Sequence, residues 1–226
     1  TLDVPVALKI LPPHVAKRDP GYAERFLREA RMAARLRHPN VVAVMDADRD
    51  EATGLYYILE EYIDGGSMAA RLGKGPIPEA KALAVVAAIA RALQAATKQG
   101  IIHRDIKPDN ILLTKDGRVK LAALGLAKVA GESEFGVTQS STAIGTPHYM
   151  SPEQIQNAKH VDVRSDLWSL GATMFHLMTG KPPFPGTDAK KIIKAVLTEA
   201  PPDPVTLNPA ISRRIADICL KCLSKN

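Results

Sequence analysis

Aromatic residues and cysteines are scarce in this sequence, and each scarcity excludes a class of protein. Phe, Trp and Tyr make up 4% of the 226 residues, which argues against the stacking platforms that bind single-stranded nucleic acid. Two cysteines are too few for a disulfide-stapled miniprotein. Cys219 and Cys222 lie in the amphipathic run Ile215–Leu223, which favours core thiols over a redox or metal site, since such a site calls for a second pair or a strand–turn–helix context.

Long apolar runs and a signal-peptide pattern are also missing. The longest uncharged apolar run, 82–90, has nine residues and is too short to cross a bilayer. The N-terminus, Thr1 to Pro5, lacks a charged segment followed by an apolar one. We therefore expect a cytoplasmic location and no membrane segment in this chain, and a membrane anchor outside it stays an open question.

The composition that remains is that of a globular protein with a modest excess of positive charge. Hydrophobic residues make up 46% and charged residues 24%, and the length suffices for one large domain or two small lobes. The formal net charge of +6 suits anionic partners such as phosphates. It is too small to indicate DNA binding, and we expect no nucleic-acid partner.

The pattern of apolar residues divides the chain into a strand-rich beginning and a helical remainder. The change falls near residue 65, and the pattern from Pro152 onward is helical. This indicates an α+β chain in two unequal parts, with room for a ligand between them. The predicted elements are strands over 4–11, 41–45 and 56–63, helices over 22–36 and 78–100, and a tight turn at Asp116-Gly117.

One polar segment, His103 to Asn110, contains the residue types that phosphoryl transfer needs. It places a carboxylate at Asp105, an amine at Lys107 and an amide at Asn110. Phosphoryl transfer needs an oriented hydroxyl, neutralised phosphate charge and a metal ion held in place. By itself, the segment is equally consistent with a salt-bridged turn.

Four further motifs accompany this segment along the chain. They are Val6–Lys9 (VALK), Glu29 on the next predicted helix, Gly145–Glu153 (GTPHYMSPE) and Asp162–Gly171 (DVRSDLWSLG). Together the five motifs resemble the protein kinase family, specifically bacterial-type serine/threonine kinases, over essentially the whole chain. The resemblance implies a bilobal α+β fold, with a small β-rich N-lobe over 1–63 and a larger helical C-lobe over 64–226. It also implies ATP, Mg²⁺ and protein substrates that carry Ser or Thr.

The resemblance implies a role for each residue that matches a catalytic motif. Lys9 would contact the α- and β-phosphates of ATP and pair with Glu29. Asp105 would accept or orient the substrate hydroxyl, and Lys107 would steady the γ-phosphate. Asn110 would bind a magnesium ion. The position of Lys107 is similar to the serine/threonine pattern rather than the tyrosine pattern.

The resemblance also implies where the adenine lies. Ala7 and Leu112 would form apolar walls, and Glu61 and Ile63 would offer backbone groups. Glu60 occupies the position that usually guards the rear of this pocket. Burying an unpaired carboxylate is costly, so Glu60 must find a partner, become protonated or face water.

Further matching residues are implied to be structural or regulatory. Asp166 would anchor the backbone at 103–104, and Glu153 would pair with a distant arginine. Thr146 would line the pocket beside the acceptor residue and brace Asp105. Arg104 would receive a phosphate added to the 128–148 segment, unless that segment is only a polar loop. The candidate phosphorylation sites are Thr138, Ser140, Ser141 and Thr142.

The sequence departs from the family pattern at a metal-binding position. The family has Asp-Phe-Gly where this chain reads KLAALG over 120–125, so Ala123 replaces the aspartate, and a methyl group cannot bind magnesium. No G-x-G-x-x-G occurs, and the chain stops before the arginine partner of Glu153. We therefore expect a fragment whose N-lobe lacks the glycine-rich loop and whose C-lobe lacks its C-terminal end.

Three functions stay open on the sequence alone. The first is a serine/threonine kinase domain whose activity is impaired by Ala123 and by truncation. The second is an inactive pseudokinase that acts as a scaffold or an allosteric interaction module. The third is a small-molecule phosphotransferase of related fold, against which the 145–153 motif argues because it resembles a protein-substrate signature.

Overall fold

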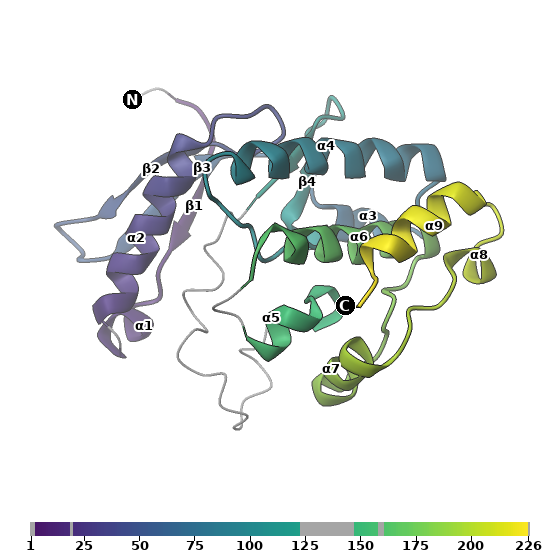
Figure 1. Ribbon diagram of the computed structural model, residues 1–226. Coiled ribbons are helices and arrows are strands. Elements are labelled where there is room, and N and C mark those ends of the chain that lie inside the picture. Colours follow the sequence, from purple (N-terminus) through teal and green to yellow (C-terminus); the bar gives the residue numbers. More distant parts are fainter. Residues whose placement is uncertain (1–2, 19, 123–146, 158–160, 226) are drawn as a thin grey trace.

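The computed structural model describes residues 3–18, 20–122, 147–157 and 161–225. A small sheet with helix α2 forms one region, and the helices from α3 onward form a larger one (Figure 1). The buried apolar side chains form two separate clusters. One is the core of the smaller region, and the other is the core of the larger region. The bilobal α+β fold predicted from the sequence is therefore confirmed.

The smaller region is built on a three-stranded antiparallel sheet in the order β1-β3-β2. Two helices lie between its first and second strands along the chain. In chain order the elements are β1 (Val6–Ile10), α1 (Pro13–Arg18), α2 (Pro20–Arg35), β2 (Val44–Arg49) and β3 (Tyr56–Glu61).

Helix α2 packs against the sheet because its large apolar residues recur on one side. Tyr22, Phe26 and Ala30 follow one another at intervals of four residues, which places them on one helical face. They are buried together with Leu11 and Ile58. The strand predicted over 4–11 and the helix predicted over 22–36 are confirmed.

In the parts of the larger region that the structure describes, helices predominate and β4 and β5 form a two-stranded hairpin. Gly117 takes a φ of +85° at its turn, as the Asp-Gly pair predicts. The helical pattern predicted over 78–100 and from Pro152 onward is confirmed. In chain order the elements are α3 (Met68–Leu72), α4 (Glu79–Thr97), η1 (Pro108–Asn110), β4 (Ile111–Leu113), β5 (Val119–Leu121), η2 (Pro147–Tyr149), α5 (Pro152–Gln156), α6 (Val163–Thr179), α7 (Ala189–Thr198), α8 (Pro204–Leu207) and α9 (Arg213–Cys222).

The strand predicted over 41–45 is wrong in its position, because β2 begins at Val44. Val41 and Val42 are buried, but they pair with β5: the Val42 N–H donates to the Leu121 carbonyl over 2.9 Å, and Val41 bridges to Leu121. From Val44 onward the chain pairs with β3, and the register of this pairing shifts between Val44 and Asp46. The apolar pair therefore joins the two regions instead of forming the sheet.

Helix α6 lies at the centre of the larger region and packs against α4 and α9. Gly171 allows the close approach of α9, because a Cβ there would lie 2.5 Å from the Cβ of Cys222. Cys219 is buried in the same interface, and its burial raises the pKa of the thiol to about 12. The prediction of core thiols at this Cys-x-x-Cys pair is confirmed for Cys219.

Helix α4 is long and apolar enough to cross a membrane, judged by length and composition alone. In the structure it is a core helix that packs against α6 and β5. Its apolar character is thus explained by burial within the fold. The buried residues are Ala82, Val85, Ala88, Ile89, Ala92, Leu93 and Ala96.

Candidate active site

The segment over residues 103–110 (the 103–110 loop) brings three predicted catalytic side chains into contact. The Lys107 Nζ lies 3.1 Å from Asp105 Oδ2, and Asn110 Nδ2 donates to the same oxygen over 2.8 Å. Asn110 Nδ2 also donates to the Asp105 backbone carbonyl over 2.7 Å. One carboxylate oxygen is therefore held by both an ammonium and an amide, and the short helix η1 fixes the spacing between them.

This geometry leaves Asp105 able to orient a hydroxyl group. Among the described residues, Asp105 Oδ1 has no hydrogen-bond partner, so it can accept the proton of an incoming alcohol. The side chains of Asp105 and Lys107 are 22% and 19% exposed. A ligand can therefore reach both groups, while partial burial strengthens their electrostatic effect.

A buried carboxylate on α6 supports the backbone of the 103–110 loop. Asp166 is 1% exposed and accepts hydrogen bonds from the N–H groups of His103 and Arg104, over 2.8 and 2.7 Å. Arg104 has a φ of +66°, which non-glycine residues rarely adopt, and Gln154 donates to its carbonyl over 2.9 Å. Desolvation raises the pKa of the Asp166 carboxyl. Asp166 and Gln154 thus hold a strained backbone immediately before Asp105.

His103 is fully buried behind the loop and is held as a neutral ring. Its Nδ1 accepts the N–H of Asp105 over 3.2 Å, which leaves the proton on Nε2, 3.0 Å from the Ala122 carbonyl. Burial lowers the pKa of His103, and this outweighs the opposing effect of Asp166. Protonation at Nδ1 would remove the acceptor that positions Asp105.

The free energy of unfolding should therefore decrease as the pH falls below about 6.5. Because the pKa of His103 is lower in the folded protein than its ordinary 6.5, the unfolded chain binds the proton first. The contribution of the neutral His103 ring to stability is complete above that pH and is lost below it, by up to about 1.4 kcal/mol per pH unit. Burial also lowers the pKa of His176, which adds a loss of the same sign.

Urea unfolding at about pH 7.5 and about pH 5.5 measures this loss. His103→Asn should reduce the pH dependence, whereas replacement of the exposed His14 by Gln should leave it unchanged. An unfolding free energy that is equal at the two pH values would contradict the buried neutral ring.

The lysine on β1 is bound by a carboxylate from β3. Lys9 Nζ lies 2.8 Å from Oε1 and 2.7 Å from Oε2 of Glu60, which is 4% exposed. Within the described residues, Lys9 forms its ion pair with Glu60. The resemblance implies a pair with Glu29 on α2 instead. The register explains the difference: Glu60 lies opposite Ala7, so Lys9 is its diagonal neighbour on the same face.

The residues expected around adenine lie on β1, at and just after the end of β3, and on β4. Glu61 Oε2 lies 2.8 Å from the Nζ of Lys120, and the backbone N–H of Glu61 donates to the Ala43 carbonyl over 2.9 Å. This N–H is therefore not available to a nucleotide. The other three residues expected there are half-buried: Ala7, Ile63 and Leu112.

A group of polar side chains beside the loop was missed by the sequence reasoning. Ser165 Oγ donates to Glu153 Oε1 over 2.6 Å and accepts from Ser151 Oγ over 3.1 Å. Ser151 and Gln154 form a capping box at the start of α5, and Gln154 then reaches the Arg104 carbonyl. The Ser-x-x-Gln spacing was the signal that could have identified this support.

Part of the predicted site lies outside the residues that the structure describes. This applies to the exchanged metal-binding position and to the predicted regulatory segment. The residues concerned are Ala123, Thr138, Ser140, Ser141, Thr142 and Thr146.

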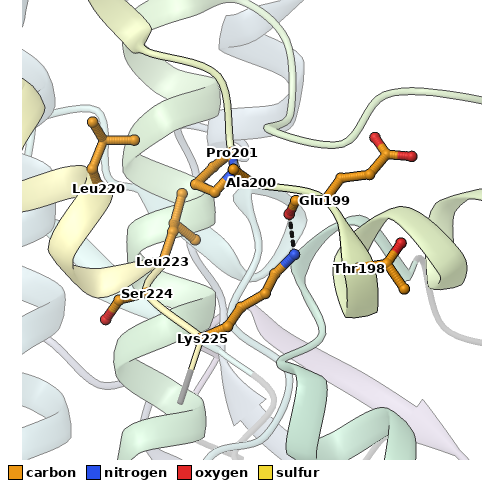
Figure 2. A pocket seen from close by; sticks show the side chains of 8 residues that line it. All are labelled: Thr198, Glu199, Ala200, Pro201, Leu220, Leu223, Ser224 and Lys225. Carbon is orange, nitrogen blue, oxygen red and sulfur yellow. Dashed lines mark hydrogen bonds between the residues drawn. The ribbon is translucent and has the colours of Figure 1, made fainter.

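A surface pocket of about 440 Å³ lies between the ends of α7 and α9, in a different part of the larger region (Figure 2). The Lys225 ammonium donates to the Glu199 carbonyl there and lies 5.0 Å from the centre of the Phe184 ring. None of the predicted site residues lines this pocket. The candidate active site is therefore assigned from the contacts among Asp105, Lys107 and Asn110 and not from this pocket. The lining residues are Thr198, Glu199, Ala200, Pro201, Leu220, Leu223, Ser224 and Lys225.

Comparison with known sequences decides the family. The family model described as "Protein kinase domain" matches residues 3–226. The chain belongs to the protein kinase family. This kinase domain is 40% identical over 225 residues to the probable serine/threonine-protein kinase SCO3848 of Streptomyces coelicolor. It is 39% identical over 224 residues to the serine/threonine-protein kinase PknB of Mycobacterium leprae.

Both alignments cover 98% of this chain, but 33% and 36% of the two relatives. The kinase domain therefore spans about a third of the length of the curated relatives that it matches. A third relative, the probable serine/threonine-protein kinase PknB of Corynebacterium glutamicum, is 37% identical over 229 residues, with 98% and 35% covered. The resemblance to bacterial serine/threonine kinases is thus confirmed.

Of the two metal donors that the resemblance implies, an asparagine and an aspartate, this chain has the asparagine, Asn110, and carries alanine at position 123. The family uses ATP and typically Mg²⁺. Asn110 offers one amide oxygen, position 123 offers none, and both oxygens of Glu60 are bound to Lys9. Over the described residues there is no group of three His, Cys, Asp or Glu side chains that could hold a metal ion. The residues present do not fit a magnesium ion held by an asparagine and an aspartate.

Proposed function

We propose that this kinase domain binds ATP and protein substrates and transfers the γ-phosphate to Ser or Thr slowly. The observation that carries the proposal is the contact of Asp105, Lys107 and Asn110 in one loop, combined with the loss of the carboxylate at position 123. The loop has a carboxylate that can orient the substrate hydroxyl and an ammonium that can neutralise phosphate charge. The missing carboxylate removes charge stabilisation that the family uses during transfer.

In the proposed reaction, the substrate hydroxyl oxygen attacks the γ-phosphorus. The bond between that phosphorus and the oxygen bridging to the β-phosphate breaks, and ADP leaves. Asp105 Oδ1 takes the hydroxyl proton, and Lys107 offsets negative charge on the transferred group. Asn110 keeps Asp105 oriented through two hydrogen bonds. The chain's own contribution is therefore positioning and charge compensation.

The second candidate function is an inactive pseudokinase that acts as a scaffold or allosteric module. Ala123 favours it, and so does the ion pair that occupies Lys9. The intact 103–110 loop favours the enzyme, because a chain released from catalysis has no need for a backbone strained at Arg104.

The other expectations from the sequence belong to the same proposal. We propose ATP as the nucleotide, with little contribution from Mg²⁺ to its binding, no nucleic-acid partner and a cytoplasmic location for this domain. A phosphate added to the 128–148 segment would be bound by Arg104, which is half-buried and lies directly before Asp105.

Labelled ATP and a generic basic protein substrate test the proposal on the full-length protein. We expect transfer that takes many minutes per turnover, and Asp105→Asn should abolish it by removing the proton acceptor. ATP binding without any transfer would favour the pseudokinase. Rapid multiple turnover, or an unchanged rate with Asp105→Asn, would contradict the proposal.

A further inference from the structure

Glu60 is a buried carboxylate that forms an ion pair with Lys9, the lysine expected to bind phosphate. Both of its oxygens lie within 2.8 Å of Lys9 Nζ, and the Glu60 side chain is 6% exposed. The Lys9 side chain is 40% exposed, so a ligand can reach the lysine more readily than the carboxylate. Glu60 shares its face of the sheet with Ile58, which is fully buried against α2. The carboxylate therefore has little access to water and depends on Lys9 for its charge compensation.

The pair is one of three that offset lysine charge around the proposed nucleotide site. Lys107 pairs with Asp105 in the 103–110 loop. On β5, Lys120 pairs with Glu61, the residue directly after Glu60. Each of these three lysines already faces a carboxylate within 3.1 Å. An incoming triphosphate therefore meets cations whose charge is compensated.

We propose that Glu60 is a specificity-determining residue of the nucleotide site. Its carboxylate competes with nucleotide phosphates for Lys9 and so lowers the preference for ATP over adenosine. This inference rests on the proposed function, since it needs the nucleotide to bind beside Lys9.

The competition follows from charge and geometry. A phosphate that contacts Lys9 must share the ammonium with Glu60 or displace it. Sharing brings like charges close together in a poorly hydrated place, and displacement leaves a buried carboxylate without its partner. Adenosine carries no phosphate and makes neither demand, so Glu60 weakens ATP binding without weakening adenosine binding.

Titration of ATP and of adenosine into the full-length protein tests the inference, because it measures binding without catalysis. Glu60→Gln keeps the shape of the side chain and removes its charge. It should tighten ATP binding by about tenfold and change adenosine binding by less than about twofold. Glu60→Met, which fills similar space without hydrogen-bonding groups, should show the same change in the ratio of the two dissociation constants.

Two further variants separate this effect from a general loss of charge. In a Lys9→Met background, Glu60→Gln should no longer tighten ATP binding. Asp203→Asn removes a carboxylate from a pair with Arg213 at α9 and should leave both affinities unchanged. If the unaltered protein binds ATP but neither Glu60 variant changes the ratio, this inference fails while the proposed function survives. If no variant binds either ligand, both fail.

Discussion

Replacement of Ala123 by aspartate is expected to raise the rate of phosphoryl transfer by on the order of a thousandfold. A carboxylate at this position restores the second metal donor, and metal stabilisation of the transferring group is worth several kcal/mol. About 4 kcal/mol corresponds to roughly three decades in rate. The residue before position 123, Ala122, donates its N–H to the backbone carbonyl of Asn110 over 2.8 Å. Asn110 is the other expected metal donor. Single-turnover transfer from labelled ATP measures the gain.

Two companion variants show whether the gain has this origin. Ala123→Asn offers an uncharged oxygen and should recover much less activity than the aspartate. Ala123→Asp combined with Asp105→Asn should fall back to background, because the added donor cannot replace the proton acceptor. A single Ala123→Asp variant that is no faster than the unaltered protein would show that another feature limits transfer.

Removal of the Asp166 carboxylate should be the most damaging change that does not touch a ligand. Asp166→Ala leaves the buried N–H of His103 and the part-buried N–H of Arg104 without their acceptor. Each such loss destabilises by about 1–3 kcal/mol, so we expect about 2–6 kcal/mol in total. Arg104 should then leave its left-handed conformation, and Asp105 should move with it. Urea unfolding and transfer rates in an Ala123→Asp background measure the two effects.

Asp162 provides a matched control for this change. It caps the N-terminus of the same helix, α6, where its Oδ1 accepts the N–H of Arg164 over 2.9 Å at the exposed surface. Loss of such a cap costs about 1 kcal/mol, and Asp162→Ala should leave the transfer rate unchanged. Equal destabilisation by the two variants would contradict a special role for Asp166.

The elements that sequence reasoning placed correctly are those whose signals are local. Helix α2 follows from apolar residues at intervals of four, and the β4–β5 turn follows from Asp116-Gly117. The 103–110 loop is equally local, since its reacting side chains lie within six residues of one another. Short-range spacing therefore placed the candidate residues together, and the resemblance of five motifs to the protein kinase family gave them their expected roles.

The features that sequence reasoning missed depend on contacts between distant residues. Val41 and Val42 look like a sheet strand, but their burial comes from pairing with β5, about eighty residues later. The partner of Glu60 could not be predicted because a diagonal neighbour is set by strand register, which the sequence leaves open. The same holds for Ser165, whose hydroxyl meets Glu153 only once α5 and α6 are packed.

Whether the 103–110 loop works without a second metal donor is measured most directly by the magnesium dependence of ATP binding. ATP is titrated into the unaltered protein and into the Ala123→Asp variant, each with and without Mg²⁺. The incomplete donor set predicts that Mg²⁺ changes the dissociation constant of the unaltered protein by less than about threefold, and that of the variant by more than about tenfold. Tightening of more than about tenfold in the unaltered protein would show that magnesium is bound by other donors, and would contradict the assignment of Ala123 as the lesion.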